Sequence, residues 1–300
     1  MTSVERDTIL VATDFTPVAD CAIDHAIEIA KLFNHKLCLL HIVSKKTGQL
    51  QRDKIIRKLE KIANAYQDRS GIEITYRLEE GSIFDEISRT ASKLKAEFVI
   101  MGIHGKKGVQ HILGSYAYKV ITSSKVPVMV VKKKHHHVGY NNIVVPIDFT
   151  YESGQKVGQA IKFAKYFDST VHIIGVIQSK SSVYKIKKEA ILKNIMDYLS
   201  NHGVKAKAEI IIKPGADIDD EVFEYSEKHD ADLIMIVAEK SGRISELFGN
   251  NVPEQIIDKA DIPVLTVIPN LEYDEDLEWD ETFLSPFYDP LGVIDKPGQS

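Results

Sequence analysis

An internal repeat constrains the fold of this chain more than any other feature of its sequence. The stretch ILVATDFT at residues 9–16 returns as IVVPIDFT at residues 143–150. A helical pattern follows each copy in the same register, and an apolar segment comes next, KLCLLHIV in the first copy and TVHIIGVI in the second. The 300-residue chain is therefore expected to contain two copies of one folding unit.

Each copy continues with the same order of patterns. A long helical pattern ends at Gly71 in the first copy and at Gly203 in the second, and an alternating strand, a short helix and a buried strand follow. A further helix leads to the final strand, VPVMVV or IPVLTVI. Five apolar strands alternating with four helices predict two tandem α/β domains, each a doubly wound, Rossmann-like parallel sheet with helices on both faces.

Composition excludes several classes of function. The net charge of −5 argues against general nucleic-acid binding, which needs a clustered positive face, and 44% hydrophobic residues suffice for buried cores. Cys21 and Cys38 match neither a disulfide framework nor a zinc-binding spacing. No apolar run of about 18 residues and no secretory leader pattern occurs, so we expect a cytoplasmic protein that does not contact a membrane.

The composition also suggests where the domains end. We expect a first domain at residues 1–134, a linker at 135–140, a second domain at 141–269 and an acidic tail with aromatic residues at 270–300. The stretch KKKHHH at residues 132–137 is expected to be a solvated linker, because no acidic or cysteine partner stands nearby at ligand spacing; we predict no metal site. The tail is hypothesised to pack on its own domains or on a neighbouring subunit.

A glycine-rich loop, MGIHGKKGVQHILGS at residues 101–115, follows a predicted strand of the first domain. Glycine lets a backbone approach a ligand closely, and the helix that starts at Gly114 and Ser115 offers unpaired N–H groups to an anion. The alternative is that Ser115 only caps its helix and the glycines relieve a turn. Asp14 ends the first strand, where a carboxylate can accept hydrogen bonds from ribose, so the pattern favours a nucleotide site.

These residues resemble the universal stress proteins, through VATDF, VPIDF, LLHIV, the glycine loop and KVITSSKVPVMVV, over about residues 5–269. The resemblance implies an adenine nucleotide alpha hydrolase-like fold that binds ATP or another adenine nucleotide, with room for Mg²⁺ beside it. It implies pairing of the two domains through their final strands and leaves open a homodimer and an unidentified protein partner. The implied contacts are Gly102, Gly105, Gly114 and Ser115 with phosphates and ribose, Ala12 and Asp14 with ribose and adenine, Ile42 with adenine, and Met101 in the pocket wall.

Both copies depart from the family motif G-x2-G-x9-G-[S/T]. In the first copy only eight residues separate Gly105 from Gly114, which puts the triphosphate geometry in doubt more than adenosine binding. The second copy keeps the spacing but replaces the four motif residues, so we expect phosphate binding there to be lost and a weaker second site at Asp148 and Val176 to remain. The replacements are Val237, Lys240, Asn250 and Asn251.

The sequence leaves three functions open. The first is a regulatory stress-response protein whose first domain binds an adenine nucleotide. The second is a scaffold that binds no nucleotide, and the third is slow ATP hydrolysis. No GxSxG, HExxH or Walker motif occurs, and we assign no catalytic residue, because the loop histidines His104 and His111 are expected to be merely exposed.

Overall fold

The computed structural model describes residues 7–103, 114–132, 139–147, 151–178, 182–237 and 252–267. The chain forms two compact units. The first comprises Met1–Val138 together with Glu254–Thr266, and the second comprises Gly139–Pro253 and Val267–Ser300. Each unit is built on parallel strands joined by helices.

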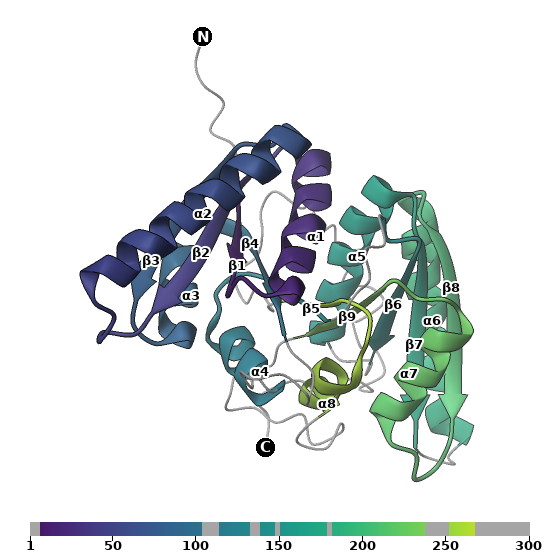
Figure 1. The fold of residues 1–300 in the computed structure, drawn as a ribbon. Helices are drawn as coiled ribbons and strands as arrows, with labels where there is room; N and C mark the ends of the chain where they lie inside the picture. The colour runs from purple at the N-terminus through teal and green to yellow at the C-terminus, as the bar shows by residue number, and fades with distance from the viewer. Residues whose placement is uncertain are drawn as a thin grey trace. The chain divides into compact units, whose positions relative to one another are not determined.

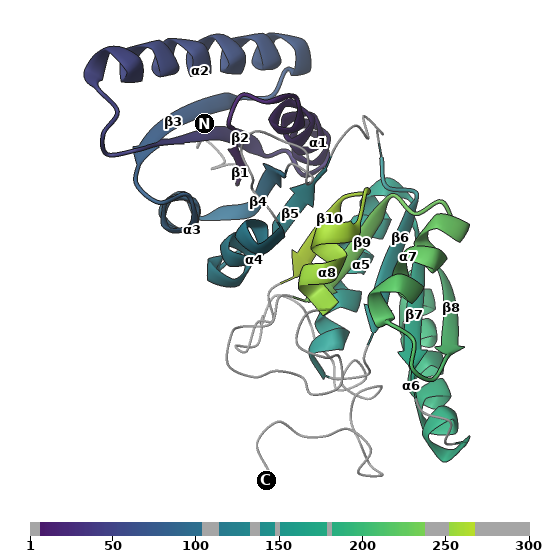
Figure 2. The same ribbon diagram turned by 60° about the horizontal axis from the view of Figure 1, so that its bottom comes forward.

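The first unit contains a parallel sheet in the order β3-β2-β1-β4-β5. Helices α1 and α2 cover one face of this sheet, and α3 and α4 cover the other (Figure 2). The alternation of strand and helix matches the predicted pattern. The elements are β1 (Thr8–Ala12), α1 (Pro17–Phe33), β2 (Lys36–Val43), α2 (Gln49–Ser70), β3 (Ile74–Glu80), α3 (Ile83–Leu94), β4 (Ala96–Gly102), α4 (Gly114–Ser123) and β5 (Val128–Val131).

The first unit also receives the end of the second repeat. After α8 (Val252–Lys259), strand β10 (Val264–Val267) pairs antiparallel with β5. The hydroxyl of Thr266 donates to the carbonyl of Val128 at 2.9 Å and accepts from the Val128 N–H at 3.3 Å. This buried ladder joins the final strands of the two repeats.

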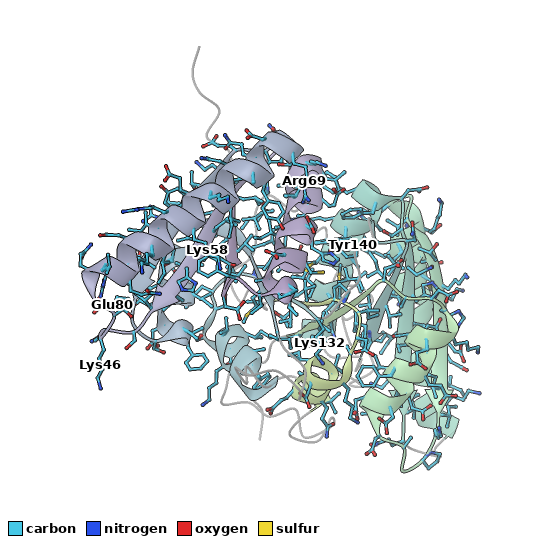
Figure 3. The ribbon with its side chains drawn as sticks, in the orientation of Figure 1. Lys46, Lys58, Arg69, Glu80, Lys132 and Tyr140 are labelled. Carbon is cyan, nitrogen blue, oxygen red and sulfur yellow. The ribbon has the colours of Figure 1, made fainter. Side chains whose placement is uncertain are left out.

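Lys132 corrects one expectation from the sequence. We expected it in a solvated linker, but it is buried, and its ammonium group donates to the carbonyl of Asp258 in α8 (Figure 3). A lysine near the last turn of a helix satisfies carbonyls that have no partner within the helix. His135, His136 and His137 lie outside the described residues.

The second unit repeats the pattern around a parallel sheet in the order β9-β6-β7-β8 (Figure 1). Helix α5 packs against α6 and against the strands, and α7 packs against β7. Its central strands are apolar and buried, as expected for a sheet covered on both faces. The elements are β6 (Asn142–Ile147), α5 (Tyr151–Phe167), β7 (Thr170–Ile177), α6 (Ser182–Asn201), β8 (Lys205–Ile212), α7 (Ile218–Lys228) and β9 (Leu233–Val237).

Local sequence explains the ends of several helices. Thr16 caps the start of α1 by accepting a hydrogen bond from the Ala19 N–H at 3.4 Å, and Pro17 occupies the first turn, where no N–H is needed. Gly71 ends α2 with a φ of 73°, a left-handed conformation that glycine adopts without strain. The predicted α/β class with doubly wound parallel sheets is confirmed. Within the described ranges, no helix is long and apolar enough to cross a membrane.

Candidate functional site

The strand order of the first unit reverses at β1. From β1 the chain adds β2 and β3 on one side and then β4 and β5 on the other. Ligands of such sheets bind beyond the carboxyl ends of the strands at this reversal. Ala12, the last residue of β1, is the register partner of Met101 near the end of β4, so these two predicted residues lie together at that edge.

Asp14 lies in the turn that leads from β1 into α1. Its Oδ1 atom accepts hydrogen bonds from the Thr16 N–H at 3.1 Å and from the Thr16 hydroxyl at 2.5 Å. These bonds fix the turn and the start of α1, so one carboxylate oxygen has a structural role. Ile42, also predicted for the site, is half-buried near the carboxyl end of the neighbouring strand β2.

Phe15 gives this edge an aromatic surface that the sequence reasoning missed. Its φ of 65° is left-handed, a conformation that a bulky residue rarely adopts and that, away from helix ends, is often found at functional sites. Its ring stacks on His41, with 4.4 Å between centroids, and the Lys58 ammonium group lies 4.1 Å from the Phe15 centroid. The repetition of Asp-Phe-Thr in both copies was the available sign that Phe15 matters.

The charges around this edge have identifiable effects. His41 donates its Nδ1–H to the Thr13 carbonyl at 2.7 Å. Burial lowers the pKa of His41 below its ordinary value, and it outweighs the hydrogen bond to Thr13 and the charge of Asp14, which act in the opposite direction. Burial, followed by the charge of Asp24, raises the pKa of the Asp20 carboxyl. The edge thus combines carboxylates with a lysine and a largely buried imidazole.

Gly102 ends β4 where α1 passes close to the strand. A Cβ atom at this position would lie 2.7 Å from both the carbonyl oxygen and the Cγ1 atom of Val18. The packing of α1 therefore accounts for a glycine at Gly102 without reference to any ligand.

Replacing Gly102 with alanine is expected to lower the free energy of unfolding by about 1–3 kcal/mol, because the new methyl group overpacks α1 against β4. Urea denaturation followed by circular dichroism measures the change. Gly48→Ala is the matched control, since no atom outside its chain neighbours lies within 4 Å of the added Cβ. Equal losses in the two variants would contradict the role of Val18.

The structure describes only some of the other residues predicted for the site. Gly114 begins α4, and Ser115 is its second residue, but the side chain of Ser115 is not among those described. Met101 is buried and Val176 is half-buried in β7. The other predicted positions lie outside the described residues, namely Gly105, His104, His111, Asp148, Lys240, Asn250, Asn251 and the tail at 270–300.

The second repeat has a buried lysine near the corresponding strand end. Lys156 on α5 is 7% exposed and donates to the carbonyl of Pro146, the penultimate residue of β6, at 2.7 Å. Aligning the two repeats through their Asp-Phe-Thr stretches matches Lys156 with Ala22, which is buried in the first repeat. The two strand ends therefore differ in charge as well as in the loop residues.

Comparison with known proteins agrees with this architecture. The sequence model of the Universal stress protein family matches residues 5–132 and again residues 139–267. A universal stress protein of Methanocaldococcus jannaschii is 32% identical over 146 residues, which cover 42% of this chain and 81% of that protein. Another universal stress protein of the same organism is 27% identical over 161 residues, which cover 44% of this chain and 99% of that protein.

A solved structure shows the same fold at low sequence identity. The crystal structure of a universal stress protein from Archaeoglobus fulgidus DSM 4304 is similar with a TM-score of 0.70 and 15% identity. The similarity covers 89% of this chain and 98% of that chain, so it extends across both repeats. With the family matching twice along the sequence, this chain belongs to the universal stress protein family and carries two of its domains in tandem.

Proposed function

We propose that the first domain binds ATP or another adenine nucleotide and that the protein acts as a regulatory stress-response protein. The observation that carries this proposal is the meeting of Ala12 and Met101 at the strand reversal, with Asp14 in the turn that follows β1. This is the edge where doubly wound sheets bind nucleotides. The left-handed Phe15 beside it supports a functional site.

Each proposed contact follows from the chemistry of the residue. The Asp14 carboxylate accepts hydrogen bonds from ribose hydroxyls, and the apolar side chains of Ile42 and Met101 border the adenine. Gly105, Gly114 and Ser115 hold phosphate together with the N-terminus of α4, whose N–H groups and dipole suit an anion. Mg²⁺ accompanies the nucleotide in this proposal, and no catalytic group is assigned.

A scaffold that binds no nucleotide is the second candidate. Two observations favour it. The close packing of Val18 accounts for a glycine at position 102, and the bonds from Thr16 give the Oδ1 atom of Asp14 a structural role, so neither residue requires a nucleotide to explain it. The loop shortened by one residue points in the same direction. In this reading the paired domains present a surface to a protein partner. Slow ATP hydrolysis would require phosphate release above that of a Ser115→Ala variant.

Titration calorimetry with ATP, after mass spectrometry for nucleotide that purifies with the protein, tests the proposal. Gly105→Lys is expected to weaken binding on the order of tenfold or more, because a long side chain fills the space in which the backbone would approach phosphate. Ser92→Lys is the matched control, since it adds the same charge at an exposed position on α3.

A second variant separates the two roles of Asp14. Asp14→Asn keeps an oxygen that can accept from Thr16 but removes the charge offered to ribose, so we expect weaker ATP binding with little change in stability. Asp14→Ala removes both. If the wild type binds no nucleotide, or if it and Gly105→Lys bind alike, the site assignment is wrong and the scaffold is favoured.

The remaining proposals follow from the same sequence patterns. We propose domains at residues 1–134 and 141–269 joined by a linker at 135–140, a weaker second site at Asp148 and Val176, and a cytoplasmic location. The tail at 270–300 is proposed to pack on the protein or on a neighbouring subunit. Proteolysis that removes the tail while leaving the melting temperature and oligomer size unchanged would contradict its proposed role.

A further inference from the structure

Three side chains of the first unit with metal-binding chemistry meet at the amino ends of its strands. Asp7 precedes β1, His35 precedes β2, and Glu97 is the second residue of β4. One imidazole nitrogen and one oxygen from each carboxylate lie within 4.8 Å of one another. The group lies at the opposite sheet edge from the proposed nucleotide site, so it is independent of that proposal.

Backbone pairing holds these residues in place. The Lys36 N–H donates to the Asp7 carbonyl at 3.0 Å, which ties the start of β1 to the start of β2. His35 is fixed by its own N–H, which donates to the Ala30 carbonyl at 2.9 Å after the helix has ended in a left-handed residue. These main-chain bonds hold Asp7 and His35 close together at the amino ends of β1 and β2.

A break in strand register directs Glu97 toward this group. Thr8 of β1 pairs with Ala96, but the next residue of β1, Ile9, pairs with Phe98, so Glu97 is the extra residue. An extra residue of this kind bends the strand and redirects its side chain. Glu97 contacts the imidazole Nε2 of His35 as a result.

The exposure of the three groups suits an ion that enters from solvent. The side chain of His35 is 8% exposed and that of Glu97 is 40% exposed, while Asp7 is exposed. The His35 ring has little room to move, because it is buried and lies beside the Phe33 ring, with 5.4 Å between ring centroids. The two carboxylates on the solvent side provide negative charge for a cation.

We propose that Asp7, His35 and Glu97 bind a divalent transition-metal ion, with Zn²⁺ as the representative. One nitrogen and two oxygen donors are ligands that Zn²⁺ accepts, and solvent completes a tetrahedral set. Mg²⁺ prefers oxygen donors alone in octahedral geometry and should bind far more weakly. The spacing of the sequence did not predict this site, because 62 positions separate His35 from Glu97 and no local motif contains either residue.

The test uses the full chain with His135, His136 and His137 replaced by serine, because adjacent histidines bind metal opportunistically. ZnCl₂ is titrated into this parent protein by calorimetry, and the same titration is repeated with MgCl₂. We expect one Zn²⁺ per chain and a rise in melting temperature, since an ion that binds the native state stabilises it. NMR should show a shift of the His35 imidazole signals on addition of Zn²⁺.

Variants assign the ligands. Glu97→Gln and His35→Gln are each expected to weaken Zn²⁺ binding about tenfold or more, while Glu60→Gln on the exposed side of α2 and His202→Gln on the second unit leave it unchanged. Glu97 is the more exposed ligand, so its variant tests the site even if His35→Gln folds poorly. The proposal is overturned if the parent binds no Zn²⁺, or if Glu97→Gln binds as tightly as Glu60→Gln.

Discussion

Lowering the pH from 7 to 4 is expected to remove about 3 kcal/mol of stability from the second unit through the single residue His172. This imidazole is 1% exposed, and burial lowers its pKa from 6.5 to about 4, with smaller contributions from His229 and Lys207. Its Nε2–H donates to the Asn142 side-chain oxygen at 3.1 Å, and its Nδ1 accepts from the Tyr225 hydroxyl at 3.2 Å. Both bonds suit the neutral ring.

The direction of the effect follows from proton binding. Between pH 6.5 and 4 the unfolded chain takes up a proton on His172 while the folded chain does not, so acid favours unfolding. The stabilisation is complete above pH 6.5 and is lost as the pH falls toward 4. Below that value the folded form is protonated too, and this residue adds no further dependence.

Hydrogen exchange of the β7 amides in denaturant, measured from pH 7 to pH 4, reports the local free energy of unfolding. His172→Gln is expected to be less stable at pH 7 but to lose much of the slope between pH 6.5 and 4. His202→Gln is the matched control, because the His202 ring donates to the Tyr198 carbonyl at the end of a helix and not inside the sheet. A slope that persists in His172→Gln would show that another group carries it.

Replacing Phe163 with alanine is expected to lower the free energy of unfolding of the second unit by about 3–5 kcal/mol. Phe163 on α5 is fully buried, and its ring lies 6.1 Å from Tyr140 and 6.0 Å from Phe167 between centroids. Tyr140 and Phe167 meet edge to face at 4.8 Å, so the three rings form one cluster at the start of the second repeat. Truncation leaves a cavity in that cluster.

Urea unfolding followed by circular dichroism tests this expectation, with hydrogen exchange to assign the loss to the second unit. Tyr166→Ala is the matched control on the same helix, because its side chain is 46% exposed, and its loss should be much smaller. Phe163→Leu should retain most of the stability, since it keeps most of the volume. Similar losses for Phe163→Ala and Tyr166→Ala would place the core of this unit elsewhere.

Much of the fold could be predicted because the spacing of apolar residues within each helix and strand can be read directly from the sequence, and because the second copy repeats the order of the first. The strand runs are apolar, the helices repeat at three to four residues, and Gly71 stops α2 where its pattern ends. Lys132 was misjudged for the opposite reason. Its burial depends on a carbonyl of Asp258, 126 residues away, and a charged run gives no local indication of such a partner.

The candidate site could be predicted only in outline. Asp14 follows from the rule that parallel strands end at one edge, which needs only the order of elements, whereas Ala12 and Met101 were implied only by the resemblance to the universal stress proteins. The stacking of Phe15 on His41 and Lys58 joins three segments, and the left-handed backbone of Phe15 contradicts what its residue type prefers. The group of Asp7, His35 and Glu97 depends on strand register, which the pattern of apolar residues does not encode at strand ends.

The pairing of β5 with β10 also sets the order in which the protein can mature on the ribosome. The first unit pairs β5 with a strand at Val264–Val267, so this ladder cannot form until more than 130 further residues have been made after β5. At about 5–20 residues per second, that delay lasts on the order of ten seconds. A nascent chain with an exposed apolar strand edge for so long is a natural substrate for chaperones, and truncation before residue 264 would make that exposure permanent.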